Sequence, residues 1–480
     1  MKIGQTTVVF FFGRIASSVI GLLATIYFTR LLGAELWGIY TVAIAVVGWV
    51  KLGGRMGVGV AVQKRMSENK DPKKYFSAGL VIVAIFSLIS ISILLILNGY
   101  IDTYIGANVS HLIATLLLVN ILYDMILSGL KGQRRVHIVG LLKPSGEIIS
   151  TITQVVLIVP FLFGLGVVGL LIGKAVGLLL ATLFGIAVLG ISFRRPSFEH
   201  IQSLISFAKY SWLGRFESKT FKEADIIIMG FFVSTKLIGI YSIAWGIAIF
   251  LNLFSSSITQ TLFPEISNAS FNEQRDYLPL IEDGVAYQGL ILIPGLVGGT
   301  ILAEPLLRVY SEEFVQGTAV LWILILSVLV KGYLQQFSVA LQAINRPDIS
   351  FKINSVFILT NIILNIVLIY LYSWVGAAIA TAVSAGIGLV LSYFAVKHLT
   401  EFSMPVRSIA EQWFAAFIMG IIIHVGYSLE QTYNIINWNI LVVIIFVFLG
   451  AGIYFGILLV ISNKFRQTIR HNLPIERLPI

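Results

Sequence analysis

Cysteine is absent from the 480-residue sequence, which excludes disulfide bonds, thiolate metal sites and cysteine nucleophiles. Charged residues are also scarce. They make up 12% of the sequence, and a soluble protein of this length would need far more of them. No stretch is long and polar enough to fold as a separate soluble domain. The composition therefore predicts a protein embedded in lipid.

Signals for enzymatic activity are mostly missing as well. The sequence contains no G-x-x-x-x-G-K-S/T phosphate-binding loop, and "GKAVG" at residue 173 is too short to be one. The six histidines have no metal-ligand spacing, and no loop is large enough for a glycosyltransferase, a glycan polymerase or a glycan ligase. We therefore expect a protein that is not an enzyme and that needs no cofactor and no metal.

Apolar residues, in contrast, are abundant. They account for 57% of the sequence, and the mean hydropathy is +0.92. Runs of roughly 20 apolar residues recur, and this is about the length that a helix needs to cross a hydrocarbon core. They predict an all-α integral membrane protein with fourteen transmembrane helices. The expected spans are 6–28, 37–60, 76–98, 111–130, 138–162, 165–191, 211–233, 238–262, 283–303, 318–343, 350–373, 375–396, 409–429 and 438–461.

Basic residues are distributed unevenly over the predicted connections. One side carries 21 Lys and Arg residues, including those of "KRMSENKDPKK" (64–74), whereas the other carries only Arg30, Lys236 and Arg308. Because cytoplasmic loops are enriched in Lys and Arg, we expect a multi-pass protein of the cytoplasmic (plasma) membrane with both termini cytoplasmic. Contact with anionic membrane lipids accounts for the net charge of +10, so no nucleic-acid partner is expected.

The sequence contains an internal repeat. Residues 13–43 align without a gap to residues 214–244, with nine identities that include Arg14 with Arg215 and Gly38 with Gly239. Six helices separate the two copies, so both run in the same direction and the halves should be related by a pseudo-twofold axis along the membrane normal. We therefore expect a six-helix N-lobe (1–200), a six-helix C-lobe (201–400), and two further helices with a basic tail (401–480).

The repeat predicts that the charged stretch "RFESKTFKEADIIIMG" (215–230) is part of a transmembrane helix, because it is the second copy of the first predicted span. On a helix, Arg215, Lys219 and Lys222 lie within about 60° of each other, with Glu223 beside them and Asp225 about 80° to the other side. Charges in hydrocarbon cost several kcal/mol each unless they face water or partners, so we expect this stripe to face the other lobe. Snorkelling of Lys219 to the headgroups is the alternative.

Other charged residues interrupt apolar helices. Lys174 and Lys331 are each expected to be either a partner of an acid such as Glu147 or a substrate contact. Lys51 and Arg55, four residues apart, fit headgroup anchoring, and the glycines around them leave an inner gate as the alternative. The expected phosphate-binding residues are Arg14, Arg215, Lys219, Lys222, Lys174 and Arg55, and the candidates for ion coupling are Asp225, Glu223 and Glu147, with Asp225 also expected in an internal salt bridge.

Several segments resemble a known family. They are residues 13–43, "GRMGVGVAVQKRMSE" (54–68), "ADIIIMGFFVSTKLIGIYSIA" (224–244), "LFPEISNAS" (262–270) and residues 346–384. In order, they are similar to the polysaccharide transporter branch of the MOP exporter superfamily, which contains the Wzx-type flippases. The likeness spans essentially the whole chain and includes the count of fourteen helices.

The resemblance implies a flippase that moves a polyprenyl-phosphate- or pyrophosphate-linked oligosaccharide from the inner to the outer leaflet by alternating access, for cell-surface glycan or glycoprotein assembly. A proton or sodium counter-ion and glycan polymerase or transferase machinery are the further partners it implies. A cationic cavity suits a lipid phosphate, because Arg forks and Lys ammonium groups both bind phosphate. The alternatives are a peptidoglycan-precursor flippase and an ion-coupled multidrug exporter of the same superfamily.

Overall fold

The structure, a computed structural model, describes residues 3–55, 57–68, 71–190, 192–271, 277–436 and 438–472. Of residues 3–17, 53–55, 209–218, 222 and 470–472 it describes the backbone alone. Over these ranges the chain forms helices, turns and no β-strand, which confirms the predicted all-α class. The helices divide into two compact units, Met1–Gly239 and Ile240–Ile480.

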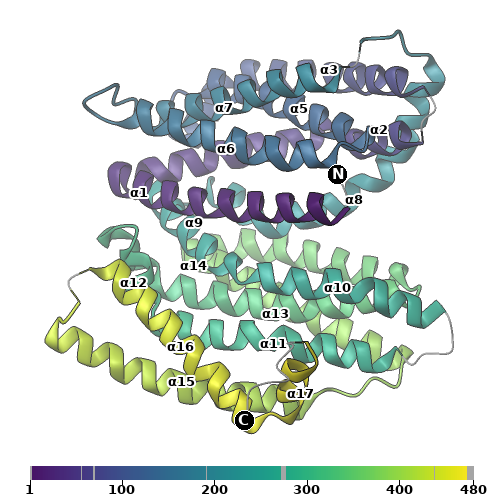
Figure 1. Cartoon of the computed structure of the whole chain (residues 1–480). Coiled ribbons are helices and arrows are strands. Elements are labelled where there is room, and N and C mark those ends of the chain that lie inside the picture. The colour runs from purple at the N-terminus through teal and green to yellow at the C-terminus, as the bar shows by residue number, and fades with distance from the viewer. Residues whose placement is uncertain are drawn as a thin grey trace. The chain divides into compact units, whose positions relative to one another are not determined.

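The first unit is drawn from purple to teal in Figure 1. Helix α5 lies at its centre and contacts α1, α2, α3, α6 and α7, so most of its residues are buried. Helix α8 packs against α1, α2 and α3. The helices of this unit are α1 (Ile3–Arg55), α2 (Val58–Ser67), α3 (Pro72–Ile96), α4 (Asn98–Ile105), α5 (Ser110–Gly132), α6 (Val136–Ile158), α7 (Gly166–Leu189), α8 (Phe198–Met229) and the start of α9 (Thr235–Phe250).

The second unit is drawn from green to yellow. Helices α13 and α14 pack together along their length, and α11 lies against α13 and α15. The helices of this unit are α10 (Asn252–Phe271), α11 (Leu278–Ile301), α12 (Ala303–Arg308), the 3-10 helix η1 (Glu312–Gly317), α13 (Thr318–Ala343), α14 (Pro347–Leu399), α15 (Val406–Tyr433), α16 (Asn439–Ile461) and α17 (Asn463–Asn472).

Two helices are twice the length of a single span, and each contains a break. In α1 the break is at Gly33, whose φ of 78° lies in the left-handed region that glycine adopts without strain. In α14 it is at Ser373, with a φ of 55°. The break at Gly33 falls between the predicted spans 6–28 and 37–60, and the break at Ser373 falls at the end of the predicted span 350–373. Each of the two long helices therefore covers two predicted spans.

Glycines allow the helices to approach closely near these breaks. A Cβ atom on Gly38 would overlap the carbonyl oxygen of Thr235, and a Cβ atom on Gly239 would overlap that of Ala34. The shift of 201 residues that defines the repeat relates Gly38 to Gly239 and also relates Ala34 to Thr235. The two copies therefore meet, within the first unit, through a reciprocal contact that has no room for a side chain.

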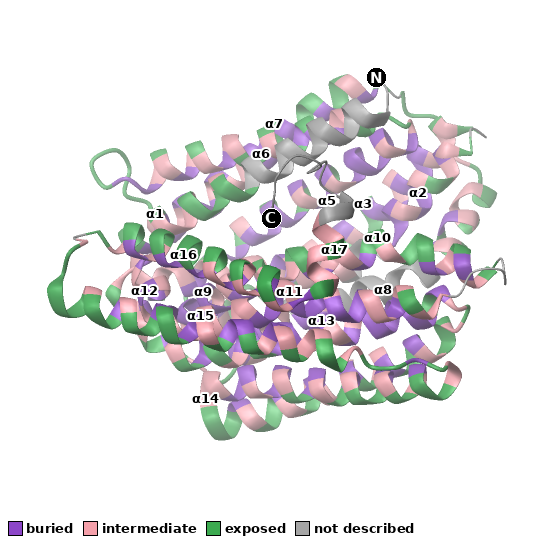
Figure 2. Cartoon of the chain, turned by 60° about the horizontal axis from the view of Figure 1, so that its bottom comes forward, coloured by how far each residue is buried: buried purple, intermediate pink, exposed green. Residues whose placement is uncertain are grey.

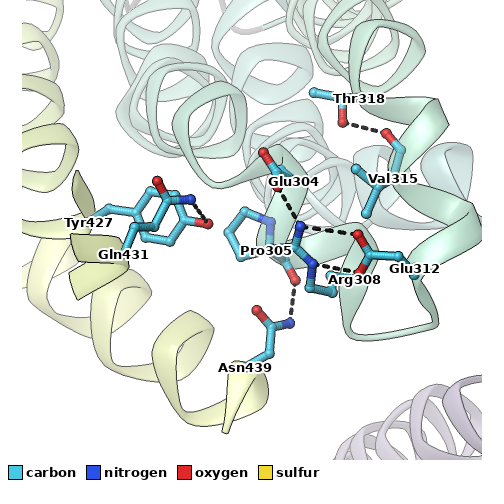
Figure 3. A network of polar contacts seen from close by, with 9 residues as sticks. All are labelled: Glu304, Pro305, Arg308, Glu312, Val315, Thr318, Tyr427, Gln431 and Asn439. Atoms are coloured by element: carbon cyan, nitrogen blue, oxygen red, sulfur yellow. Dashed lines mark hydrogen bonds and ion pairs between the residues drawn. The ribbon is translucent and has the colours of Figure 1, made fainter. Parts of the chain in front are cut away.

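Polar contacts attach α15 and α16 to the rest of the second unit, and Figure 3 shows the one made by Asn439 at the start of α16. The side chain of Asn439 donates to the carbonyl of Pro305 at 2.8 Å. Beside it, the Arg308 guanidinium holds both Glu304 and Glu312, and its Nε lies 2.8 Å from Glu312 Oε2. At the other face, the buried Gln412 side chain donates to the carbonyl of Ala286 on α11 at 2.8 Å. The C-terminal helices are thus docked through backbone carbonyls.

Exposed apolar side chains cover the outer faces of many helices. Figure 2 shows exposed and intermediate residues along the helices rather than at their ends alone. On α14, Leu359, Ile363 and Tyr370 are 61%, 59% and 75% exposed and recur at helical spacing. Apolar stripes of this length need hydrocarbon around them. In the described chain, eleven helical segments are long and apolar enough to cross a membrane, which supports a multi-pass membrane protein.

The structure corrects several predicted boundaries. Helix α8 begins at Phe198, whereas the sequence predicts a span from residue 211, because amphipathic turns precede the apolar part of the helix. Helix α10 extends to Phe271 and contains Pro264, so "LFPEISNAS" is helical rather than a connection. The basic tail also includes helix α17, whose Lys464 pairs with Asp283 on α11. The prediction relied on apolar runs and therefore missed the helical turns in these more polar segments.

We predict that Gly239→Ala destabilises the protein by roughly 1–3 kcal/mol, because the added methyl group forces two backbones apart. The matched control is Gly246→Ala on the same helix, where a Cβ atom has no neighbour within 4 Å. The control should be neutral or stabilising by up to about 1 kcal/mol, since alanine favours helix. The unfolding midpoint in detergent measures both, and equal midpoints for the two variants would contradict the proposed close approach.

Candidate functional site

The charged stretch of residues 215–230 lies on one continuous helix. Helix α8 runs without a break from Phe198 to Met229, so the stretch is not a loop. One face of α8 is buried over the two helical turns that follow residue 218. The buried residues there are Thr220, Phe221, Ala224 and Asp225. Asp225 is 4% exposed. An ionisable group at this depth is costly unless the protein surrounds it with partners, which makes Asp225 a candidate functional residue.

Lys219 and Glu223 form an ion pair on the same helix. They are four residues apart, and their side chains are 18% and 28% exposed. The pair lies against Gly48 of α1, where a Cβ atom would run into the Lys219 ammonium group. Glycine at this position therefore leaves room for a charged pair between two packed helices. Lys219 is paired within the bundle, whereas snorkelling was the alternative expected from sequence.

Lys51 lies one turn further along α1 and is also paired. Its ammonium nitrogen is 3.2 Å from Asp124 Oδ2 and 3.3 Å from Asn120 Oδ1, both on α5. The side chains of Lys51 and Asp124 are 28% and 22% exposed. The ammonium group of Lys51 is thus held by the neighbouring helix, and headgroup anchoring stays a prediction.

Lys174 on α7 extends the same group of charges. It is partly buried and interacts electrostatically with Glu147 on α6 and with Lys51 on α1. Lys174 and Glu147 influence each other electrostatically, and their direct pairing stays a prediction. We call the charged side chains of Lys51, Asp124, Glu147, Lys174, Lys219 and Glu223 the charged band of the first unit.

The charged band differs from a bare cationic stripe. Each of its three lysines lies near a carboxylate, so the described members are close to electrical neutrality. A lysine paired in this way can exchange a carboxylate for another oxyanion such as a phosphate oxygen. The arrangement is thus suited to binding anions in competition with its own acids.

Four of the expected phosphate-binding residues cannot be compared with the prediction. The backbone is helical at Arg14, Arg55, Arg215 and Lys222, but their side chains lie outside the described residues.

The C-terminal end of α8 is held by a tyrosine of α4. The hydroxyl group of Tyr104 on α4 donates to the carbonyl of Ile227 at 2.6 Å, and its ring lies 4.7 Å from that of Phe231. Gly230 has no side chain, so it leaves space for this hydroxyl group. Burial raises the pKa of Tyr104, so the hydroxyl remains a donor at neutral pH. This contact fixes the end of the helix that carries the band.

The second unit contains polar groups that sequence reasoning missed. Asn361 and Asn365, one turn apart on α14, are fully buried, and Asn361 donates to Thr381 at 3.3 Å. Gln288 on α11 donates to Gln336 on α13 at 3.3 Å, also in the interior. The signal in the sequence was amides at helical spacing in apolar runs, which is weaker than a charge.

Lys331 on α13 is 7% exposed, and its ammonium group lies 4.1 Å from the ring centre of Phe357. A cation over an aromatic face is stabilised electrostatically when it is removed from water. Lys331 therefore has a structural contact within its own unit. Over the ranges that the structure describes, no group of three or more His, Asp or Glu side chains could hold a metal ion.

Comparisons with known proteins agree with this architecture. The chain is 30% identical to "Probable flippase AglR" of Haloferax volcanii over 98% of both chains. It is 27% identical to "Probable low-salt glycan biosynthesis flippase Agl15" of the same organism over the full length of both. Its fold is similar to that of a lipid II flippase MurJ structure in an inward closed conformation, with a TM-score of 0.77, 19% identity, and 96% and 100% of the two chains covered.

The family described as "Polysaccharide biosynthesis protein" matches residues 27–316, which is more than half of the sequence. The match agrees with the likeness of residues 13–43, 54–68 and 224–244 to the polysaccharide transporter branch of the MOP exporter superfamily. The chain belongs to the polysaccharide biosynthesis protein family, and the predicted likeness to the Wzx-type flippases is confirmed.

Proposed function

We propose that the chain is a flippase that moves a polyprenyl-phosphate- or pyrophosphate-linked oligosaccharide from the inner to the outer leaflet of the cytoplasmic membrane, for cell-surface glycan or glycoprotein assembly. The observation that carries the proposal is the charged band, because three lysines and three carboxylates lie within helices of membrane-spanning length. Full-length similarity to proteins named as flippases supports it.

The phosphate head is the part of the cargo that hydrocarbon excludes most strongly. We assign it to Arg14 and Arg215, which the internal repeat relates, with Lys219, Lys222, Lys174 and Arg55 as further contacts. Arginine forks match phosphate oxygens bidentately, and lysine supplies a point charge. Lys51 joins this set, because it lies beside Lys174 in the band. The polyprenyl tail would remain in lipid.

Competition within the band provides a route to ion coupling. A phosphate that takes Lys219 or Lys51 from its carboxylate leaves that carboxylate without its cation. The freed group then binds a proton or a sodium ion, because a carboxylate at this depth is unstable alone. Glu223 is the coupling candidate that this exchange would free from Lys219, and Glu147 and Asp225 are the other two candidates. The substrate and the counter-ion would thereby be linked through the same lysines.

The architecture that we propose for this function has fourteen spans. Two of the eleven apolar segments contain a break, at Gly33 in α1 and at Ser373 in α14, so they count as four spans and the total becomes thirteen. The charge-rich α8 would be the fourteenth span. An N-lobe (1–200) and a C-lobe (201–400) related by a pseudo-twofold axis would alternate in access. The reciprocal contact at Gly38 and Gly239 supports this symmetry. The two further spans within residues 401–480 would be an addition, and both termini would be cytoplasmic.

Two other functions of the superfamily involve different cargo. A multidrug exporter for cationic drugs needs an acidic or aromatic cavity, whereas basic residues outnumber acids at the proposed site. A peptidoglycan-precursor flippase handles a similar lipid phosphate, so only the glycan separates it from the proposal. Translocation by this chain would need no catalytic group, while glycan polymerase or transferase machinery would act on the delivered product.

The decisive experiment is a proteoliposome assay. The purified protein is reconstituted with a defined polyprenyl-linked glycan, and glycan reaching the opposite leaflet is measured under imposed proton and sodium gradients. Transport of the glycan lipid, and of no cationic drug, is the expected result. Drug transport without glycan transport would overturn the proposal.

We predict that Arg14→Ala and Arg215→Ala each abolish translocation while leaving expression intact, because each removes half of the phosphate site. The control is Arg195→Ala, a change of the same kind in an exposed connection. The proteoliposome assay measures the rates. Full transport by the double variant would rule out the phosphate clamp.

A second prediction distinguishes a role of Lys51 in cargo binding from a purely structural role in its ion pair with Asp124. Lys51→Met removes the ammonium group that lies 3.2 Å from Asp124 and should lower stability by roughly 1–3 kcal/mol. The double variant Lys51→Met with Asp124→Leu should regain this stability, because both polar partners are gone. Transport should nevertheless stay low in the double variant. Lys397→Met, an exposed change on α14, is the control, and wild-type transport by the double variant would make the pair purely structural.

A further inference from the structure

A second cationic site lies at the end of the first unit where the basic connections gather. A cavity of about 450 Å³ opens where the C-terminal ends of α2, α5 and α7 meet the N-terminal ends of α3 and α6. Its lining includes Lys73, Arg134 and Arg135 together with Ser67, Gln133 and Gly190. None of the residues that line it is acidic. The charged band does not contribute to this cavity.

The side chains around the cavity are held in place by backbone contacts. Arg135 donates to the carbonyl of Val188 at 2.7 Å, and Gln133 donates to the carbonyl of Leu189 at 3.0 Å. Arg134 donates to the carbonyl of Ser67 at 3.3 Å. Each of these bonds uses only part of a guanidinium or amide group, so donors remain for a ligand. The guanidinium groups of Arg134 and Arg135 are therefore positioned by backbone carbonyls, and the exposed Lys73 completes the lining.

Nearby acids are paired with other basic residues. Glu68 lies 3.0 Å from Arg65, and Asp71 lies 3.3 Å from Lys74. Those lysine and arginine residues are outside the cavity lining. The positive charge of Lys73, Arg134 and Arg135 is thus left for an anion.

An apolar groove continues from the cavity along the same helices. It has a volume of about 190 Å³ and is lined by residues of α3, α5 and α7 and by Phe193. Leu189 in the groove adjoins Gly190 in the cavity, and Phe76 in the groove lies one turn from Pro72 in the cavity. Its one polar residue, Thr182, donates to its own helix at Leu178. The groove is therefore suited to hydrocarbon.

We propose that this composite site binds an anionic lipid of the cytoplasmic leaflet, with its phosphate among Lys73, Arg134 and Arg135 and one hydrocarbon chain in the groove between α3, α5 and α7. Cationic pockets between helices on this side of a membrane protein are suited to anionic headgroups. A zwitterionic headgroup fits less well, because no acid lines the cavity to receive its cation. The site is separate from the proposed transport path.

The test uses the full chain in detergent and native mass spectrometry with added phosphatidylglycerol. The wild-type protein should retain one phosphatidylglycerol in preference to phosphatidylcholine. The variant Lys73→Gln/Arg134→Gln/Arg135→Gln should weaken this binding by about tenfold or more. The matched control, Arg195→Gln/Lys352→Gln/Lys397→Gln, removes three exposed basic residues outside the cavity and should bind as the wild type does.

The groove is tested independently by filling it. Ile186→Trp should lower lipid retention, whereas Leu183→Trp, at a similarly exposed position on the same helix outside the groove, should not. Equal loss in both charge variants would show diffuse attraction and overturn the proposal. So would equal retention of phosphatidylcholine, or binding of a polyprenyl phosphate in place of phosphatidylglycerol. Transport defects of the Arg14 and Arg215 variants with normal lipid retention would keep the two proposals distinct.

Discussion

The constraint on which the interior depends is the cost of a charge removed from water. Three of the described lysines show how this cost is met: Lys51 pairs with Asp124, Lys219 pairs with Glu223, and Lys331 lies over the ring of Phe357. A lone ammonium group in hydrocarbon would cost several kcal/mol. The pairing therefore allows a membrane protein to keep charges available for an ionic cargo.

Such pairing requires helices that approach closely, and glycine provides the space. Gly48 leaves room for the Lys219 and Glu223 pair between α1 and α8. Gly38 and Gly239 let two helix starts meet backbone to backbone. Small residues at helix contacts are common in membranes, where dispersion and polar contacts replace the hydrophobic effect between helices. Here the same feature serves both close packing and charge pairing.

Sequence periodicity predicted the helical class and most of the spans, because hydrocarbon thickness imposes nearly the same length on each. It also placed Glu223 beside Lys219, since four residues make one turn of helix. The contact of Lys51 with Asp124 could not be read from the sequence, because 73 residues separate them and only packing of α1 on α5 brings them together. The cavity at Arg134 depends on the meeting of five helix ends, which no local pattern records.

The two copies of the repeat have the same close backbone contact but differ in the charge of their side chains. Arg14 aligns with Arg215, and Gly38 aligns with Gly239, yet two charged residues lie between them in the first copy and six in the second. The glycine positions must match because each contact is reciprocal, so a side chain in either copy would separate both. No such restriction applies to the faces of α1 and α8 away from this contact. Duplication would thereby preserve the geometry while one copy acquired the charges that a phosphate-bearing cargo requires.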